Sequence, residues 1–303
     1  MLQHTLGKSY TFEGKGLHTG QFSRMTVSPA PEDSGIRFRR TDLGKDVWLD
    51  ALADRVDSTS RSTRISNGEA SINTIEHLLS ALTGMGVDNA IVDIDNAEVP
   101  ILDGSARRYV EAFAADGLVA QTAERKYVTV KEAIEVRDEK SGSWVRIEPA
   151  GRPSYDVTVD FGSRVLGVQS AHWDEDLPYA DQVGVCRTFV FFHEIEYLFA
   201  NNLIKGGDVD NAIVIVEHPV SDEQLDRMSA SMGLPRLSVV GNGYLDNLSL
   251  HFDNECGRHK LLDLVGDLRL TGGFLQAKVT AYKPGHTINN LAARAVLAQL
   301  REA

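Results

Sequence analysis

RHKLLDLVGD, residues 258–267, is the stretch from which the rest of the sequence can be interpreted. On an α-helix His259 and Asp263 share a face because they are four residues apart, and Asp267 lies one turn further along the same stripe. The intervening positions are mostly leucine and valine, which indicates a largely buried helix. Buried imidazoles and carboxylates are usually paired or bound to a metal, because leaving them unpaired costs free energy.

Two interpretations of this polar stripe stay open from the stretch alone. In the first, His259 and Asp263 supply two of the three protein ligands that a hydrolytic zinc site requires. In the second, the same side chains form an ion pair or a hydrogen bond along one helix face.

The composition is that of an ordinary globular protein. The chain has 303 residues, more than one hydrophobic core usually holds, so we expect one large domain or two of about 150 residues. Hydrophobic residues make up 42% and charged residues 24% of the chain. The net charge of −12 argues against a nucleic-acid partner, which needs a basic surface, but not against an anionic small molecule held by a local basic pocket.

Cysteine content and apolar runs bear on location. Cys186 and Cys256 are too few for a disulfide framework, so we interpret them as reduced thiols of a cytoplasmic protein. Cys256 lies three residues before His259, but we favour a small buried thiol over a metal ligand. The N-terminal residues contain no apolar signal core, and no run reaches the roughly 18 apolar residues of a membrane-spanning helix. We therefore expect neither export nor a spanning segment.

Two parts of the chain repeat the same pattern. Glu-His-Leu-Leu at 76–79 opens a helix predicted from about Thr74, and His-Lys-Leu-Leu at 259–262 opens a similar one. After each helix we expect a glycine stop, a strand, a loop and a second helix, with the final loop at 284–290 and the final helix at 291–303. One repetition is too little for a solenoid, so the pattern predicts a duplicated unit.

We predict an α+β fold of two domains, residues 1–124 and 125–303. Each unit presents a sheet with helices on one face, and the two helical layers pack together. The second unit includes an insertion at about 183–216 that has no counterpart in the first. Duplication places His77 and His259 at similar points of two packed repeats, so we expect them to face one another, which favours the metal interpretation.

Several separated motifs resemble one known family. They are GLHTG at 16–20, TIEHLL at 74–79, ILDGS at 101–105, RTF at 187–189, RHKLLD at 258–263, GD at 266–267 and GHTINN at 285–290. The family is the bacterial zinc deacetylase of lipid A biosynthesis, UDP-3-O-acyl-N-acetylglucosamine deacetylase. The resemblance covers essentially the whole chain and implies a UDP-linked acylated amino sugar as the molecular partner.

The resemblance also implies a metal site. His77, His259 and Asp263 match the family's zinc ligands, a set that leaves one coordination position open for water. One catalytic Zn²⁺ is expected, with Fe²⁺ as the alternative ion in the cell.

Further roles are carried over from the family to single positions. Glu76 matches the general base, and His286 matches the residue that protonates the departing amine. Asp267 matches the carboxylate that orients this histidine. Thr188 matches a hydroxyl donor to the oxyanion, and Lys260 matches a cation near the sugar or its diphosphate. Taken singly, Glu76 fits a helix N-terminus, Thr188 an ordinary strand residue and Lys260 a solvated lysine.

In the family, the stretch at 183–216 forms a hydrophobic passage for the substrate's fatty acyl chain. Phe189, Phe191, Ile195 and Leu203 have suitable side chains, and Gly207 lies in a turn beside them. We expect these residues to line the passage, where each buried CH₂ of the acyl chain contributes about 0.8 kcal/mol. The alternative is an ordinary βαβ core segment.

The chain departs from familiar stand-alone members in two ways. Ser60-Arg61-Ser62 is more polar than in some relatives, so contacts at the active-site entrance are left open. GKGLHTG at 14–20 and KGGDVDN at 205–211 are more similar to the branch in which the deacetylase is fused to an acyl-carrier-protein dehydratase. We therefore expect a dehydratase domain beyond Ala303.

Three rival functions stay open. They are a zinc amidohydrolase of another acylated amino sugar, a catalytically silent homologue that binds an acyl-sugar nucleotide or a structural metal, and a carrier-protein-binding module. Glu76 and His286 have no role in a closed structural site, which counts against the silent homologue. A carrier-protein surface predicts a basic patch, and the sequence offers none beyond Arg107-Arg108 and residues 37–40.

Overall fold

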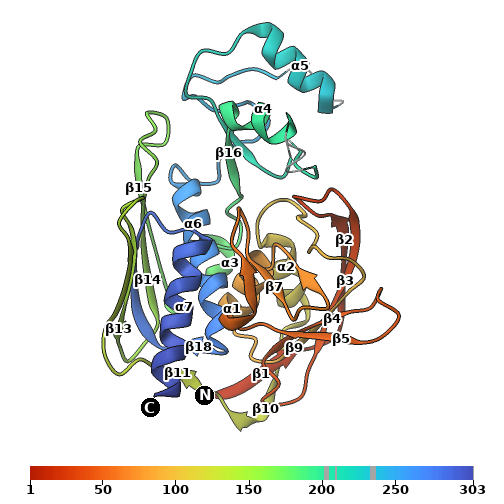
Figure 1. The fold of residues 1–303 in the computed structure, drawn as a ribbon, viewed down its shortest axis with the longest axis vertical. Coiled ribbons are helices and arrows are strands. Elements are labelled where there is room, and N and C mark those ends of the chain that lie inside the picture. Colours follow the sequence, from red (N-terminus) through yellow and green to blue (C-terminus); the bar gives the residue numbers. More distant parts are fainter. Residues whose placement is uncertain (201–204, 209, 233–236, 303) are drawn as a thin grey trace.

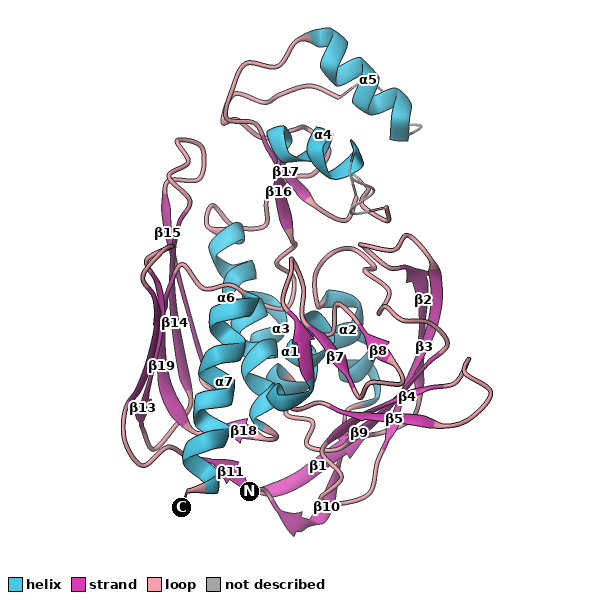
Figure 2. Ribbon diagram, in the orientation of Figure 1, coloured by secondary structure: helices cyan, strands magenta, loops and turns pink. Residues whose placement is uncertain are grey.

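The computed structural model describes residues 1–200, 205–208, 210–232 and 237–302. Two five-stranded sheets form the outer layers, and helices lie between them (Figure 1). Figure 2 shows this arrangement by secondary structure, with the helical layer enclosed by the two sheets. The predicted α+β class is confirmed.

Two similar units make up this arrangement. The first contains β2 (Tyr10–Lys15), β3 (Phe22–Pro29), β4 (Ile36–Arg40), β5 (Val47–Asp50), α1 (Glu76–Gly84), β9 (Ala90–Ile94) and α2 (Arg107–Asp116). The second contains β12 (Ile134–Asp138), β13 (Ser143–Pro149), β14 (Ser154–Asp160), β15 (Val168–Asp174), α6 (Glu255–Leu268), β19 (Ala277–Tyr282) and α7 (His286–Arg301).

The two sheets have the same topology. Their strand orders are β2-β3-β9-β4-β5 and β12-β13-β19-β14-β15. In each sheet the last strand in sequence is central, antiparallel to one neighbour and parallel to the other. In each unit one helix precedes that central strand and another follows it. The predicted duplication is therefore confirmed, while the boundary between residues 124 and 125 stays a prediction.

Shorter elements join and extend the units. They are β1 (Leu2–Leu6), η1 (Ala53–Arg55), β6 (Val56–Ser58), β7 (Arg64–Ser66), β8 (Ser71–Ile72), β10 (Leu118–Glu124), β11 (Tyr127–Val128), α3 (Tyr179–Gln182), β16 (Phe189–Phe191), α4 (Phe192–Ala200), β17 (Ile213–Ile215), α5 (Asp222–Met232), η2 (Arg269–Thr271) and β18 (Phe274–Leu275). β1 pairs with β10, β11 pairs with β18, and β6, β7 and β8 form a small sheet of their own.

The insertion of the second unit projects away from the sheets and helices (Figure 1). β16, α4, β17 and α5 all lie between β15 and α6. β16 and β17 pair in parallel, and the insertion has a small hydrophobic cluster that includes Phe192, Ile195 and Val214. α5 lies beyond residue 216, so the inserted elements continue past the predicted range.

Burial explains the composition of the central helices. Strands such as β14 alternate buried and half-buried positions, because one face packs on the helices. α1 and α6 pack against each other between the two sheets, and all of α1 from Glu76 to Thr83 is buried. Such helices have no solvated face, which is why polar residues on them need partners. No helix in the described part of the chain has the length and apolar character required to span a bilayer.

One expectation is wrong. Residues 286–290 were expected to lie in a loop, but α7 already begins at His286. The preceding Gly285 is extended and ends the loop. Asn289 and Asn290 have low helix propensity, but their side chains donate to Asp267 Oδ2 (2.9 Å) and the Ala53 carbonyl (3.4 Å). These tertiary hydrogen bonds stabilise a first turn that local propensity does not favour.

Candidate active site

The facing helices bring together the predicted metal ligands. His77 from α1 and His259 from α6 lie with ring centroids 5.0 Å apart. Each Nε2 is 3.5 Å from Oδ1 of Asp263. The three ligand atoms all lie within 4.8 Å of one another, and all three residues are buried. This is the two-histidine, one-carboxylate donor set that the sequence predicts.

His259 and Asp263 are in the protonation states that bind a cation, a neutral imidazole and an ionised carboxylate. His259 Nδ1–H donates to the Cys186 carbonyl at 3.1 Å, which leaves the Nε2 lone pair facing Asp263. Burial lowers the pKa of His259 to about 3, so the imidazole is neutral. Burial opposes ionisation of Asp263, but the Lys260 ammonium outweighs this effect and holds the pKa of Asp263 well below its usual value.

The two oxygens of Asp263 have different surroundings. Oδ2 accepts a hydrogen bond from Lys260 Nζ at 2.7 Å. Oδ1 is buried and has no hydrogen-bond partner among the described residues, yet it faces the two imidazoles. A buried carboxylate oxygen without a donor is costly unless a cation is bound there, so this atom supports a metal fit.

A second pair of acid–base groups adjoins the triad. His286 Nε2 lies 3.8 Å from Glu76 Oε1, and Glu76 is next to His77 in the sequence. Burial raises the pKa of Glu76, while the charge of His286 opposes the increase. Burial alone would lower the pKa of His286, but Asp267 and Glu76 raise it to about 9. The imidazole is therefore protonated at neutral pH.

Asp267 and Thr63 hold this pair in place. Asp267 Oδ2 contacts His286 Nδ1 at 2.9 Å. Thr63 Oγ1 donates to Asp267 Oδ1 at 2.6 Å, and the Thr63 main-chain N–H donates to Glu76 Oε2 at 3.1 Å. Thr63 thus contacts Glu76 directly and supports His286 through Asp267. Thr63 lies in a serine- and threonine-rich stretch without periodicity, so no sequence pattern pointed to it.

Backbone geometry at the start of α1 aims Glu76 and His77. Thr74 has φ of +61°, which is rare for a β-branched residue and indicates local strain. Its hydroxyl donates to Glu98 Oε1 at 2.9 Å, and the buried Glu98 carboxylate also accepts the main-chain N–H of His18 at 2.9 Å. The GLHTG motif therefore contributes to the turn that begins α1.

Glycines permit two close approaches. A side chain at Gly266 would collide with the main-chain oxygen of Glu76, so glycine lets α1 and α6 approach at the site. A side chain at Gly206 would collide with the Gly16 carbonyl oxygen. The insertion thereby packs against the GLHTG loop, and the Gly206 N–H donates to the Leu17 carbonyl at 2.9 Å.

Thr188 is half-buried on the segment that leads from Cys186 into β16. Its main-chain N–H donates to the Gly104 carbonyl at 2.8 Å, in the ILDGS motif. The preceding Arg187 is buried and its Nε donates to Glu255 Oε1 at 2.9 Å, at the first residue of α6. This buried ion pair, which the sequence analysis did not identify, fixes the segment that carries Thr188.

The aromatic residues predicted for the acyl passage group together. Phe189 and Phe191 both contact the ring of Phe161, at centroid distances of 5.5 and 5.8 Å. Phe189 also lies 6.3 Å from the ring of His259, and Lys260 Nζ is 5.4 Å from the Phe189 centroid.

The other predicted passage residues differ in their surroundings. Ile195 packs inside the insertion's own hydrophobic cluster, the alternative considered for this segment. Gly207 is half-buried. Leu203 lies outside the described residues. The passage itself stays a prediction.

Comparison with known proteins agrees with this geometry. A family model described as UDP-3-O-acyl N-acetylglycosamine deacetylase matches residues 3–231 and 236–298. The chain belongs to this deacetylase family. The family predicted from the motifs is confirmed.

The relatives that are similar to this chain include longer bifunctional enzymes and shorter deacetylases. A bifunctional enzyme LpxC/FabZ of Porphyromonas gingivalis is 43% identical over 300 residues, which cover 99% of this chain and 65% of that protein. The UDP-3-O-acyl-N-acetylglucosamine deacetylase of Thioalkalivibrio sulfidiphilus is 37% identical over 300 residues, which cover 98% of this chain and 90% of the relative. The chain therefore spans about two thirds of the longer relatives and nine tenths of the shorter ones.

Proposed function

We propose that this protein removes the N-acetyl group of UDP-3-O-[(3R)-3-hydroxyacyl]-N-acetylglucosamine by hydrolysis, releasing acetate and a free amine in lipid A biosynthesis. The observation that carries the proposal is the pairing of a buried His77–His259–Asp263 ligand set with an adjacent Glu76–His286 couple. A structural ion needs only the ligand set. An acid and a base beside it are what amide hydrolysis requires.

We propose Zn²⁺ as the ion, with Fe²⁺ as the alternative in the cell. Two imidazole nitrogens and one carboxylate are donors that both ions accept, and the unpartnered Oδ1 of Asp263 supports the fit. When bound, the ion supplies Lewis acidity for the amide carbonyl and for a water molecule. The ligand set leaves at least one coordination position to these oxygens.

The chain's own residues manage the protons of the reaction. Hydrolysis adds the oxygen of water to the amide carbonyl carbon and breaks the carbon–nitrogen bond. Glu76 accepts the proton that the water loses, and His286, protonated at neutral pH, donates a proton to the departing amine. Asp267 keeps His286 oriented and charged. Thr188 contributes a hydroxyl donor to the negative carbonyl oxygen.

Substrate contacts are proposed for the residues around this centre. Lys260 places a cation beside the ligand set, where it donates to Asp263, and we propose that this cation also contacts the sugar or its diphosphate. Phe189 and Phe191 form an apolar surface next to His259 that suits an acyl chain. Ile195, Leu203 and Gly207 complete the proposed passage.

Three further expectations are kept as proposals. They are the domain limits 1–124 and 125–303, a cytoplasmic location, and a fused acyl-carrier-protein dehydratase beyond Ala303. The name and length of the LpxC/FabZ relatives support the fusion. Reading the source gene through codon 303 tests it, and a stop codon there would contradict it.

Acetate release from UDP-3-O-acyl-N-acetylglucosamine is the decisive measurement. Purified protein is assayed as isolated, after chelation, and after one equivalent of Zn²⁺ or Fe²⁺ is restored. We expect activity to disappear on chelation and to return with one equivalent. Tight binding of one ion without acetate release would instead favour a silent homologue or another amide substrate.

A further inference from the structure

A cavity lies between the two units at the C-terminal end of α1, whereas His77 lies at the start of that helix. Its volume is about 300 Å³. Residues 83–86 and Leu118 line it from the first unit, and Tyr155, Trp173 and Phe274 line it from the second. An apolar cavity of about 150 Å³ can hold benzene. This cavity therefore has room for a molecule of two fused rings.

The aromatic wall of the cavity is held in place by neighbouring groups. Tyr155 and Trp173 are cross-strand partners on β14 and β15, with ring centroids 5.6 Å apart. Trp173 Nε1 donates to the Leu177 carbonyl at 3.2 Å, and its ring centroid lies 5.4 Å from that of Tyr179. The Tyr179 hydroxyl bonds the Ser80 hydroxyl of α1 at 2.6 Å. Because these contacts join the second sheet to α1, the cavity is preformed, as ligand sites usually are.

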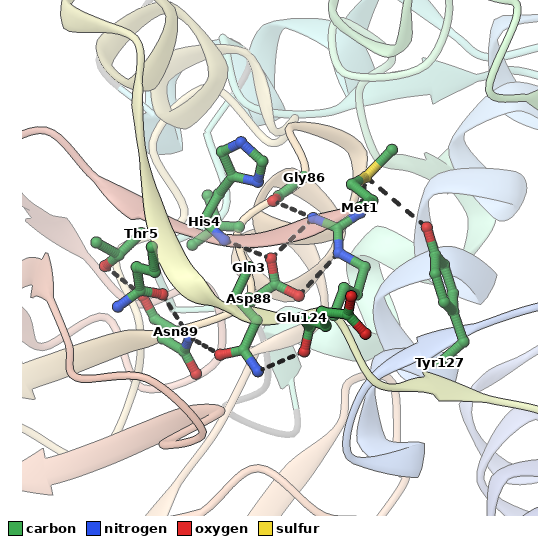
Figure 3. Close-up of polar contacts among 12 residues, drawn as sticks. Met1, Gln3, His4, Thr5, Gly86, Asp88, Asn89, Glu124 and Tyr127 are labelled. Atoms are coloured by element: carbon green, nitrogen blue, oxygen red, sulfur yellow. Dashed lines mark hydrogen bonds and ion pairs between the residues drawn. The ribbon is translucent and has the colours of Figure 1, made fainter.

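The groups of the lining that can only donate hydrogen bonds already have acceptors. Arg125 donates to both oxygens of Asp88, at 2.9 and 2.8 Å, and to the Gly86 carbonyl at 2.7 Å (Figure 3). The indole N–H of Trp173 is bonded to Leu177. The carboxylate of Asp88 also balances the charge of Arg125, so the guanidinium gives the cavity no excess positive charge.

Hydrogen-bond acceptors, in contrast, are available. The Tyr155 hydroxyl lines the cavity and makes no hydrogen bond within the described chain, and it keeps accessible surface although the residue is only 3% exposed. Glu175 lines the same cavity and pairs with Arg152 at 3.7 Å, which is too long for a hydrogen bond. Burial raises the pKa of Tyr155, with Arg269 opposing and Glu175 adding to the increase. The hydroxyl is therefore protonated and lies near the Glu175 carboxylate.

We propose that this cavity binds a neutral, planar molecule of two fused aromatic rings that carries one N–H or O–H donor, with indole as the probe. The aromatic side chains of the lining contact its rings. The Tyr155 oxygen and the Glu175 carboxylate accept its donor. A neutral ligand is favoured because the charged groups described above already have ion-pair partners. The site does not depend on the proposed deacetylation.

Thermal unfolding of the metal-loaded protein in increasing concentrations of indole tests the site. The matched probe is 1-methylindole, which has the same rings and no donor. We expect indole at ten times its Kd to raise the Tm by about 2 °C, because a ligand that binds only the folded state stabilises it. We expect 1-methylindole to bind about tenfold more weakly. A Tm independent of indole, or equal affinity for the two probes, would overturn the proposal.

Two conservative substitutions test the acceptors. Glu175→Gln removes the charge, and Tyr155→Phe removes the hydroxyl but keeps the ring. Each should weaken indole binding about fivefold. The matched control is Glu148→Gln, because the Glu148 side chain is 35% exposed against 36% for Glu175 and also pairs with one arginine. The control should bind indole as the unaltered protein does. Unchanged affinity in Glu175→Gln and Tyr155→Phe would contradict the assigned contacts.

Crystals of the unaltered protein soaked in 5-bromoindole locate the ligand without any substitution. An anomalous bromine peak between Tyr155, Trp173 and Phe274 would support the site. A peak only beside His259, or none at all, would overturn it.

Discussion

Asp263 and Asp267 lie one turn apart on α6, on the same stripe and equally buried, yet they have different surroundings. Asp267 is saturated, with contacts to Thr63 at 2.6 Å and to His286 and Asn289 at 2.9 Å each. Asp263 receives one hydrogen bond and keeps one oxygen unpartnered. The saturated carboxylate holds a positive imidazole, whereas the unsaturated one is suited to a metal ion.

The neighbouring helices cause this difference. α1 places His77 opposite Asp263, and α7 places His286 opposite Asp267. Identical residues on one helix therefore acquire different chemistry from what packs against them. The comparison predicts that substitution of Asp263 impairs metal binding, whereas substitution of Asp267 impairs proton transfer by His286.

Asp263→Ala has the largest expected effect. Loss of one of three ligands should abolish stoichiometric metal binding and reduce acetate release by about 10³-fold or more, since the ion's Lewis acidity is worth several kcal/mol. Metal content by plasma emission spectrometry and acetate release check both. Asp267→Ala is the matched control and should retain one equivalent of metal. Equal metal content in the two variants would contradict the prediction that only Asp263 binds the metal.

Glu76→Gln tests the acid–base couple beside the ligands. A carboxamide cannot accept the proton, so kcat should fall by about 10³-fold with metal content unchanged. In the unaltered protein, burial raises the pKa of Glu76, so activity should decline as pH falls through that raised pKa. The variant should lack this acidic limb in a kcat/KM–pH profile. Persistence of the limb would assign the base to another group.

Asp267→Asn should lower kcat by about 10²-fold and change the alkaline limb. Asp267 helps to raise the pKa of His286 to about 9, so the imidazolium is present below that pH and is lost above it. Without the carboxylate, burial lowers the pKa of His286, and the alkaline limb should move to lower pH. An unmoved limb with normal metal content would mean that His286 is not the acid.

Thr63→Val has the smallest expected effect. It removes the hydroxyl that donates to Asp267 but keeps the main-chain N–H that donates to Glu76. We expect about a 10-fold loss in kcat without loss of metal, and recovery in Thr63→Ser. A Thr63→Ser variant as impaired as Thr63→Val would indicate packing rather than hydrogen bonding.

Part of the site could be predicted from local spacing. His259, Asp263 and Asp267 share a stripe because a helix repeats every 3.6 residues, and the duplicated pattern indicated that His77 faces His259. Other features depend on contacts between distant residues. Thr63 reaches Asp267 across 204 positions of sequence, and Arg187 reaches Glu255 across 68. The periodicity of hydrophobic residues along the sequence does not predict contacts between residues so far apart.

The α+β class, the duplication, the family and the candidate ligand set could be predicted from the chain without its structure, because these depend on periodicity and on motifs in order. Tertiary contacts were needed to show which carboxylate keeps a free oxygen, that Lys260 donates to Asp263, and that α7 begins at His286. The physical reason is that hydrogen-bond satisfaction and electrostatics depend on what packs opposite a side chain, and packing partners are distant in sequence.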